Sequence, residues 1–194
     1  AFEDSYPTSH IMDYTHKTLK NLGLEQIDLM QFHTWDDVWS DREEWQRAIE
    51  DLKTSGKIAA MGVSMNRWEP ENGIKALKTG FLDAVQVIYN IFDQAPIDIL
   101  FPLCKEMDIA TIARVPFDEG TLTGTMTKET TFPEGDWRGT YFVPENLISS
   151  VEHADALRPL IPEGITMAEM ALRFILMNDN VSTTIPGMRK QRNV

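Results

Sequence analysis

Cysteine is almost absent from this chain, and so are long apolar runs. Cys104 is the only cysteine among 194 residues, so the chain forms no internal disulfide and no cysteine cluster for a metal. Such sparse cysteine is typical of proteins in a reducing cytosol. No apolar run of about 18 residues and no signal-peptide pattern occurs, which excludes membrane insertion and secretion. The sequence therefore predicts a cytoplasmic protein.

Basic residues are also scarce, with 18 Lys and Arg against 30 Asp and Glu and a net charge of −12. This charge repels nucleic acid and anionic lipid, so neither is expected as a partner. A phosphate ligand would have to be held locally, by helix N-termini and a few Lys or Arg side chains. With 42% hydrophobic and 25% charged residues, the composition predicts a single domain over residues 1–194 with a real core.

Two sequence motifs are missing as well. No G-x-G-x-x-G follows a predicted strand, which excludes a Rossmann dinucleotide-binding unit. No G-x-S-x-G nucleophile elbow occurs either, which argues against a hydrolase that combines a serine with a histidine.

Short apolar stretches alternate with amphipathic stretches along most of the chain. The apolar stretches predict strands over residues 27–32, 57–63, 83–89, 109–115 and 181–185, and the first four begin 26–30 residues apart. Each stretch is separated from the next by a helical pattern or by a loop. Regular alternation of strand and helix is typical of an α/β fold with a parallel sheet and right-handed crossovers.

The helical patterns have clear start and stop signals. Ser9 is expected to cap a helix that Gly23 ends, and residues 41–55 carry an apolar stripe at helical spacing, ended by Gly56. Further helices are predicted over residues 70–77, 96–107 and 145–157, and from Thr166, which forms a capping box with Glu169. Residues 117–144 are rich in glycine and proline, and loops of this length are usually functional or mobile.

Polar residues follow the predicted strands at each C-terminal end. They are His33, Ser64, Asn66, Gln86, Asn90, Arg114, Gly187 and Arg189. Strands that end around one site are typical of a (β/α)8 barrel, although such barrels have about 250 residues. His33 can exchange a proton near neutral pH. The alternative is a structural histidine that is hydrogen-bonded inside the protein.

The segments IDLMQFH, GKIAAMGVS, DAVQVIYN, ARVPFDEGTLTG and IPGMRKQRNV, in this order, closely resemble the aldo-keto reductases. The resemblance implies an incomplete (β/α)8 TIM-barrel type fold, with five parallel strands that match strands 4 to 8 of the family barrel. It also implies an oxidoreductase that reduces an aldehyde or ketone to an alcohol with NADPH. The first three βα units of the family are missing from the matched portion.

The resemblance places the catalytic histidine of the family on His33, where it would orient the substrate or assist proton transfer. The family's catalytic Asp, Tyr and Lys belong to its first three strands and have no counterpart here. The alternative function is a catalytically inactive truncated barrel that binds nucleotide weakly or self-associates through open strand edges.

The resemblance further implies NADP as the cofactor. Ser64 and Asn66 resemble the pair that contacts the nicotinamide carboxamide, although Met65 stands where the family usually has the asparagine. Gln86 matches the strand glutamine of this contact and offers both a donor and an acceptor; the alternative is an internal polar residue. Arg114 is expected to flank the nicotinamide ring or reach an acid group of the substrate, or else to form a buried ion pair.

The remaining cofactor residues follow the fourth and fifth strands. The loop of residues 116–124 resembles the family loop that folds over the pyrophosphate, with the candidates Pro116, Phe117, Gly120, Leu122 and Gly124. Without the resemblance it is an ordinary glycine-rich loop. Gly187, Met188, Arg189 and Arg192 resemble the site of the ribose 2′-phosphate, where an arginine fork suits a phosphate. The alternative is a solvated basic terminus.

The roles of two further sets of residues have more than one interpretation. Trp35 and Trp39 would line a substrate pocket or pack in the core. Cys104 is expected to be a buried helix residue rather than a reactive thiol.

Overall fold

The computed structural model describes residues 6–188 and residue 191. The predicted cofactor residues Arg189 and Arg192 lie outside these residues. The chain forms two compact units, unit 1 with residues 1–88 and 95–112 and unit 2 with residues 89–94 and 113–194. The organisation as a single domain stays a prediction.

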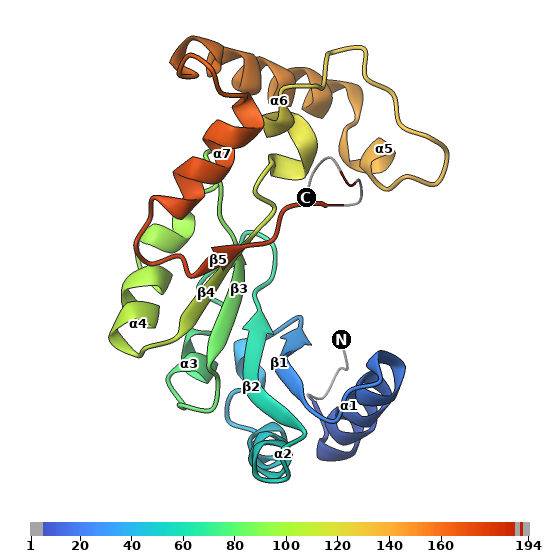
Figure 1. Ribbon diagram of the computed structural model, residues 1–194, viewed down its shortest axis with the longest axis vertical. Coiled ribbons are helices and arrows are strands. Elements are labelled where there is room, and N and C mark those ends of the chain that lie inside the picture. Colours follow the sequence, from blue (N-terminus) through green and yellow to red (C-terminus); the bar gives the residue numbers. More distant parts are fainter. Residues whose placement is uncertain (1–5, 189–190, 192–194) are drawn as a thin grey trace. The chain divides into compact units, whose positions relative to one another are not determined.

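Five strands form one sheet in the order β1-β2-β3-β4-β5. They are β1 (Ile27–His33), β2 (Ile58–Ser64), β3 (Ala84–Ile88), β4 (Ala110–Arg114) and β5 (Thr183–Thr184) (Figure 1). β1 pairs with β2, and β2 with β3, in parallel. The spatial order equals the order in the sequence, as it does in a (β/α)8 barrel, where each strand lies next to the following one. The predicted parallel α/β fold is confirmed.

The helices of unit 1 are α1 (Thr8–Leu22), α2 (Glu43–Thr54), α3 (Ile74–Leu77) and α4 (Leu100–Glu106), with 3-10 turns at η1 (Asp37–Trp39) and η2 (Ala95–Ile97). α1 and α2 lie side by side. α2 buries Trp45, Ala48, Ile49 and Leu52, which are the residues of the predicted stripe. Gly23 and Gly56 follow α1 and α2 with φ of 67° and 69°, a conformation that favours glycine and stops a helix.

An aromatic cluster forms much of the core of unit 1. Trp35 and Trp45 are fully buried, and their rings meet edge to face with centroids 5.2 Å apart. The Trp45 indole N–H donates to the carbonyl of Trp39 at 2.9 Å. Trp39 is buried as well. Trp35 and Trp39 therefore belong to the core, one of the two roles predicted for them.

Unit 2 contains η3 (Asp118–Thr123), α5 (Arg138–Tyr141), α6 (Pro144–Ala156), η4 (Arg158–Leu160) and α7 (Met167–Leu176). Part of the long loop packs on α6, because Met126, Phe132 and Tyr141 cover the cluster of Phe142, Leu147 and Val151. α7 begins as predicted: Thr166 Oγ1 accepts a hydrogen bond from the Glu169 N–H at 3.1 Å. The Glu169 carboxylate pairs with Arg173 at 2.6 Å.

Several predicted boundaries are wrong. α1 begins at Thr8, because the Pro7 carbonyl already accepts from the Ile11 N–H, so Ser9 is not the cap. The helix predicted over residues 70–77 is reduced to α3, since Gly73 has φ of 130°. The helix over residues 96–107 divides into η2 and α4 at Ile99, whose φ is −127°.

The outer strands also differ from the prediction. β1 extends one residue beyond the predicted end, to His33, and only its residues Ile27 and Phe32 are buried, because β1 is an end strand of the described sheet. β5 has two residues, since a turn from Asn178 to Val181 takes up the start of the predicted strand. Ile185 still donates its N–H to the Ala113 carbonyl at 3.1 Å.

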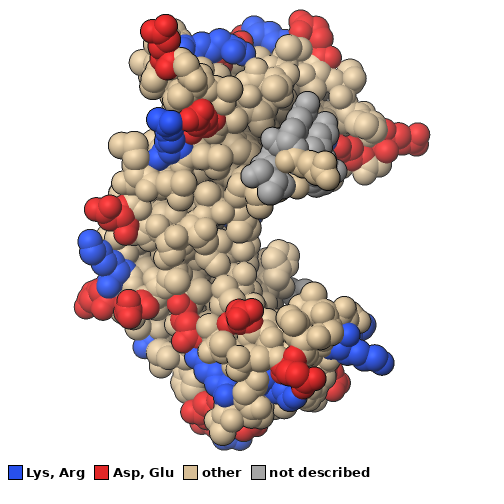
Figure 2. All heavy atoms as spheres, viewed as in Figure 1, with Lys and Arg blue, Asp and Glu red and all other residues tan. Residues whose placement is uncertain are grey.

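Acidic and basic side chains are interspersed over the face that Figure 2 shows, including the surface around α1 and α2. Among the described residues, no helix is both long and apolar enough to cross a membrane. In the same part of the chain, no three His, Cys, Asp or Glu side chains are grouped as metal ligands.

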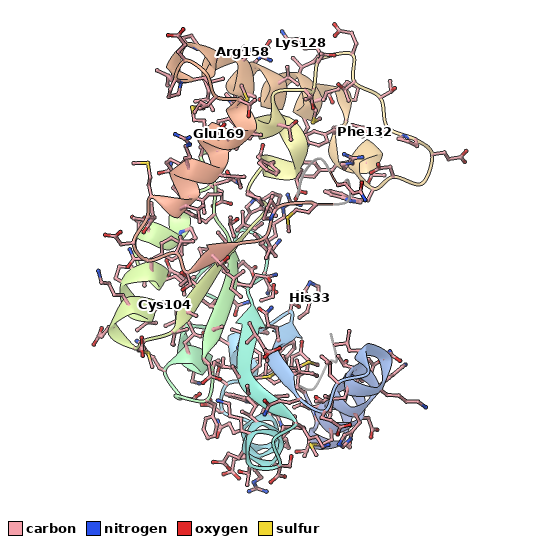
Figure 3. All side chains as sticks on the ribbon, in the orientation of Figure 1. His33, Cys104, Lys128, Phe132, Arg158 and Glu169 are labelled. Carbon is pink, nitrogen blue, oxygen red and sulfur yellow. The ribbon has the colours of Figure 1, made fainter. Side chains whose placement is uncertain are left out.

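Cys104 is buried on α4 (Figure 3), and burial raises the pKa of its thiol to about 12. Only the thiolate is nucleophilic, so the folded chain should react with iodoacetamide at pH 8 at least ~100-fold more slowly than the chain unfolded in urea. Mass spectrometry of the alkylated protein over time measures both rates. Equal rates in the folded and unfolded chain would contradict this assignment.

Candidate active site

Three predicted site residues lie in register on neighbouring strands in unit 1: His33 and Ser64 end β1 and β2, and Gln86 lies in the middle of β3. His33 ends β1 (Figure 3) and is paired in register with Ser64 of β2, which is paired with Gln86 of β3. Ser64 is buried, Gln86 half-buried and His33 exposed. The parallel register thus places one titratable and two hydrogen-bonding side chains along one sheet edge.

The Gln86 side-chain amide is hydrogen-bonded to two other side chains, and the Gln86 backbone is bonded to Met65. Its Nε2 donates to Ser64 Oγ at 3.4 Å, and its Oε1 accepts from Gln31 Nε2 at 3.5 Å. Both distances are near the upper limit for a hydrogen bond. The Gln86 carbonyl accepts from the Met65 N–H at 2.8 Å. Sequence reasoning missed Gln31, although it stands two residues before His33 and so faces the same side of the strand.

Asn66 contacts the loop that follows His33. Its Nδ2 donates to the Trp35 carbonyl at 2.7 Å and its Oδ1 accepts from the Trp35 N–H at 3.4 Å. Asn72 joins the same loop, accepting from the Asp37 N–H at 2.9 Å and donating to the Trp35 carbonyl at 3.1 Å. Both amides donate to Glu69, and these hydrogen bonds lower the pKa of Glu69. We refer to Asn66, Glu69 and Asn72 as the loop clamp.

The Asn66→Ala substitution should lower the free energy of unfolding by about 1–3 kcal/mol, because it leaves polar backbone groups of Trp35 without partners. The amide N–H of Trp35 should exchange faster with solvent. Urea unfolding and hydrogen exchange measure these two effects. Asn21→Ala, at an exposed position of α1, is the matched control and should change stability by less than about 0.5 kcal/mol. If the Trp35 amide N–H is as well protected from hydrogen exchange in Asn66→Ala as in wild type, the assignment of the loop clamp is contradicted.

In unit 2, the chain turns sharply after β4. Arg114 ends this strand and is half-buried. Val115 follows with φ of 56°, which is unusual for a β-branched residue. The buried Asn90 side chain donates to the Val115 carbonyl at 3.0 Å, and the Tyr89 N–H donates to the Arg114 carbonyl at 3.3 Å. These two bonds hold the turn that directs the chain into the predicted pyrophosphate loop.

The backbone of that loop is hydrogen-bonded internally. The N–H groups of Gly120 and Leu122 donate to the Phe117 carbonyl at 2.9 and 3.1 Å, and the Gly124 N–H donates to Thr121 at 3.1 Å. Gly120 has φ of 123° and Gly124 of 71°, so glycine is favoured at both positions. Leu122 and Pro116 are buried. The loop therefore has a hydrogen-bonded conformation of its own, with Gly120 and Gly124 at positions of positive φ.

A cavity of about 530 Å³ in unit 2 is lined both by this loop and by residues 186–188. It is lined by Phe117, Thr123, Thr125, Thr166, Ala168, Leu172, Pro186, Gly187 and Met188. Phe117, Gly187 and Met188 were predicted to serve one ligand, and they share this cavity. The three threonines were missed, because a lone hydroxyl has no sequence signature. Thr123 and Thr125 share a hydrogen bond of 2.8 Å, so hydroxyl groups gather at this wall.

A smaller cavity of about 210 Å³ lies in unit 1, between α1 and β1. It is lined by Tyr6, His10, Ile11, Tyr14, Met30, Gln31, Phe32, His33 and Met61. The Tyr6 hydroxyl donates to the Thr34 carbonyl at 2.6 Å, and burial raises the pKa of Tyr6 to about 12. Tyr6 is therefore fixed as a protonated structural donor beside His33.

A model of the Aldo/keto reductase family matches residues 2–194 of the chain. The chain belongs to the aldo-keto reductase family. The resemblance found in five sequence segments is thereby confirmed, and the five-stranded parallel sheet is a partial (β/α)8 barrel of this family.

Similar proteins include the NADH-specific methylglyoxal reductase of Escherichia coli (strain K12), 28% identical over 88% of this chain and 52% of that protein. The aldo-keto reductase YhdN of Bacillus subtilis (strain 168) is 30% identical over 94% of this chain and 55% of that protein. Among solved structures, a glycerol dehydrogenase from Gluconobacter oxydans superposes with a TM-score of 0.80 and 27% identity, over 96% of this chain and 57% of that one. This aldo-keto reductase chain spans about half the length of the relatives it matches.

Proposed function

We propose that this chain binds a nicotinamide dinucleotide and takes part in the reduction of an aldehyde or ketone to an alcohol. The observation that carries the proposal is the alignment of His33, Ser64 and Gln86 across three parallel strands at one sheet edge. An amide and a hydroxyl supply the donors and acceptors that a nicotinamide carboxamide needs. The family match supports this class of chemistry.

In this proposal the dinucleotide supplies a hydride when it is bound, and the chain binds and orients the reactants. Ser64 and Gln86 hold the nicotinamide end. The exposed imidazole of His33 hydrogen-bonds the substrate carbonyl or assists the proton transfer to its oxygen. As a separate proposal for unit 2 taken by itself, its cavity, with Phe117, Gly187 and Met188 in the wall, would bind a phosphate or ribose group. Within unit 1, Asn66 would support the site through the loop after His33, and within unit 2 Arg114 is proposed as a cofactor-binding residue.

We further propose NADPH as the preferred dinucleotide, because Arg189, Lys190 and Arg192 place three cations within four residues of an acidic chain. An arginine fork binds a 2′-phosphate with two hydrogen bonds. One similar protein is named as NADH-specific, so both dinucleotides belong in the test. We propose a small carbonyl compound as the substrate and the cytoplasm as the location.

The test is a fluorescence titration of the purified 194-residue chain with NADPH and NADH, followed by dinucleotide oxidation at 340 nm with methylglyoxal as substrate. An intact-mass measurement fixes which polypeptide is assayed. Saturable binding of NADPH, tighter than that of NADH, and oxidation that depends on the carbonyl compound are expected. Failure to bind either dinucleotide would overturn the proposal.

A second candidate is a non-catalytic chain that binds nucleotide weakly and associates through an open strand edge. It is favoured by the position of β1 at the end of the described sheet and by the cavity beside it, because an end strand leaves backbone groups for another strand to pair with. Turnover by the 194-residue species would exclude this candidate. Dinucleotide binding without turnover, together with a dimer in sedimentation, would support it.

A further inference from the structure

Gln31 carries a buried acceptor without a donor. Its Oε1 is inaccessible to solvent, and the described part of the chain offers it no hydrogen-bond partner. Its Nε2, in contrast, reaches Gln86 Oε1 at 3.5 Å. A buried polar atom without a partner costs about 1–3 kcal/mol, so such an atom in a native protein requires an explanation. A hydrogen-bond donor on a bound ligand would satisfy this oxygen.

The glycine at position 62 of β2 leaves space for the Gln31 side chain to cross this strand. Gln31 on β1 is in register with Gly62 on β2, and Gly62 is in register with Ala84 on β3. A Cβ atom at Gly62 would lie 3.2 Å from Gln31 Cγ and 3.0 Å from the Ala84 carbonyl oxygen. Because position 62 has no side chain, the Gln31 side chain leans over β2 towards Gln86.

The result is a row of three polar side chains on one face of the sheet. Gln31 donates to Gln86, and Gln86 donates to Ser64. His33 lies two residues after Gln31 and therefore faces the same side. The unsatisfied acceptor thus belongs to the group of side chains to which we assign the nicotinamide end of the dinucleotide.

No other amide of the neighbouring loop is placed to fill this role. Met65 directly follows Ser64 and is buried. The Asn66 amide is engaged with the Trp35 backbone and Glu69. A carboxamide presents an NH2 group and a carbonyl oxygen, and Gln31 Oε1 is an acceptor to which the described residues offer no donor.

We propose that Gln31 is a cofactor-binding residue whose Oε1 accepts a hydrogen bond from the NH2 of the nicotinamide carboxamide. The proposal rests on the proposed function, because it requires that the chain binds a nicotinamide dinucleotide. It deepens that function by assigning recognition of the carboxamide to a residue of β1, next to the Ser64 and Gln86 pair.

The test compares NADP+ with its 3-acetylpyridine analogue, in which a methyl group replaces the NH2 and no donor remains. Dissociation constants are measured by calorimetry for wild type and Gln31→Met, which removes the acceptor at nearly constant volume. Wild type should bind NADP+ about 10-fold more tightly than the analogue. In Gln31→Met the difference should fall to about twofold or less. Binding of 2′-phospho-ADP-ribose, which lacks the nicotinamide, should be unchanged and shows that the variant is folded.

Two more variants sharpen the result. Gln31→Glu keeps an acceptor at this position and should retain at least about a threefold preference for NADP+. Gln26→Met, at an exposed position just before β1, should retain the full preference. If Gln31→Met still prefers NADP+ as strongly as wild type does, the role of Gln31 is overturned while the proposed function stands. If wild type binds 2′-phospho-ADP-ribose and neither dinucleotide, both are overturned.

Discussion

The Trp45→Ala substitution is expected to lower the free energy of unfolding by about 3–5 kcal/mol. Trp45 is fully buried on α2, and its ring meets those of Trp35 and Phe81 edge to face, with centroids 5.2 and 5.8 Å away. The substitution leaves a cavity among these rings and leaves the Trp39 carbonyl without the indole N–H that it accepts at 2.9 Å. Urea unfolding followed by far-UV circular dichroism measures the loss.

Trp68→Ala is the matched control within unit 1. Trp68 is 70% exposed and contacts the Arg67 guanidinium through its ring, 4.9 Å from the centroid. An exposed contact of this kind contributes about 0.5–1 kcal/mol, so the control should lose no more than that. Equal losses in Trp45→Ala and Trp68→Ala would contradict the aromatic core of unit 1.

The His33→Gln substitution is expected to lower the rate of carbonyl reduction by about 10²–10⁴-fold, the usual contribution of a general acid or base. Glutamine retains hydrogen-bonding groups but exchanges no proton near neutral pH. The dissociation constant for NADPH should stay within about twofold, because Ser64 and Gln86, rather than His33, are assigned to the dinucleotide. Initial rates at 340 nm and a binding titration separate the two quantities.

His16→Gln serves as the control, since His16 is exposed on α1 and has no assigned role. It should leave the rate unchanged. If the His33→Gln variant has the wild-type rate, His33 takes no part in the reaction. The same conclusion follows if the rate falls only because the dinucleotide binds more weakly.

The strands and most helices could be predicted because local signals and tertiary packing agree. The apolar spacing of Trp45, Ala48, Ile49 and Leu52 matches the buried face of α2. Gly23 and Gly56 adopt the left-handed conformation that ends a helix. The alternation of strands and helices predicted the parallel sheet.

Elements controlled by side-chain hydrogen bonds could not be predicted in the same way. The helix expected from residue 70 begins only at Ile74, since Asn66, Glu69 and Asn72 bind one another and the loop after His33. The short helix α5 and the packing of Phe132 against Phe142, with ring centroids 5.6 Å apart, lie inside a segment predicted to be a loop. Contacts between distant residues decide these features, and a single sequence does not display them.

The candidate site was predicted where a residue ends a strand and was missed where a side chain crosses to another strand. His33, Ser64 and Gln86 follow from their strand positions. The role of Gln31 can be inferred only from the strand register, which places Gly62 beside it. Thr123 and Thr125 join the cavity of unit 2 through the folding of the loop.

The binding of NADPH and of 2′-phospho-ADP-ribose to wild type and Gln86→Met tests the central claim most directly. The claim is that the strand ends of unit 1 hold the nicotinamide end of the dinucleotide. Removal of the amide should raise the dissociation constant for NADPH about 10-fold, because hydrogen bonds to the carboxamide are lost. The constant for 2′-phospho-ADP-ribose should stay within about twofold. An unchanged affinity for NADPH in Gln86→Met would contradict the claim.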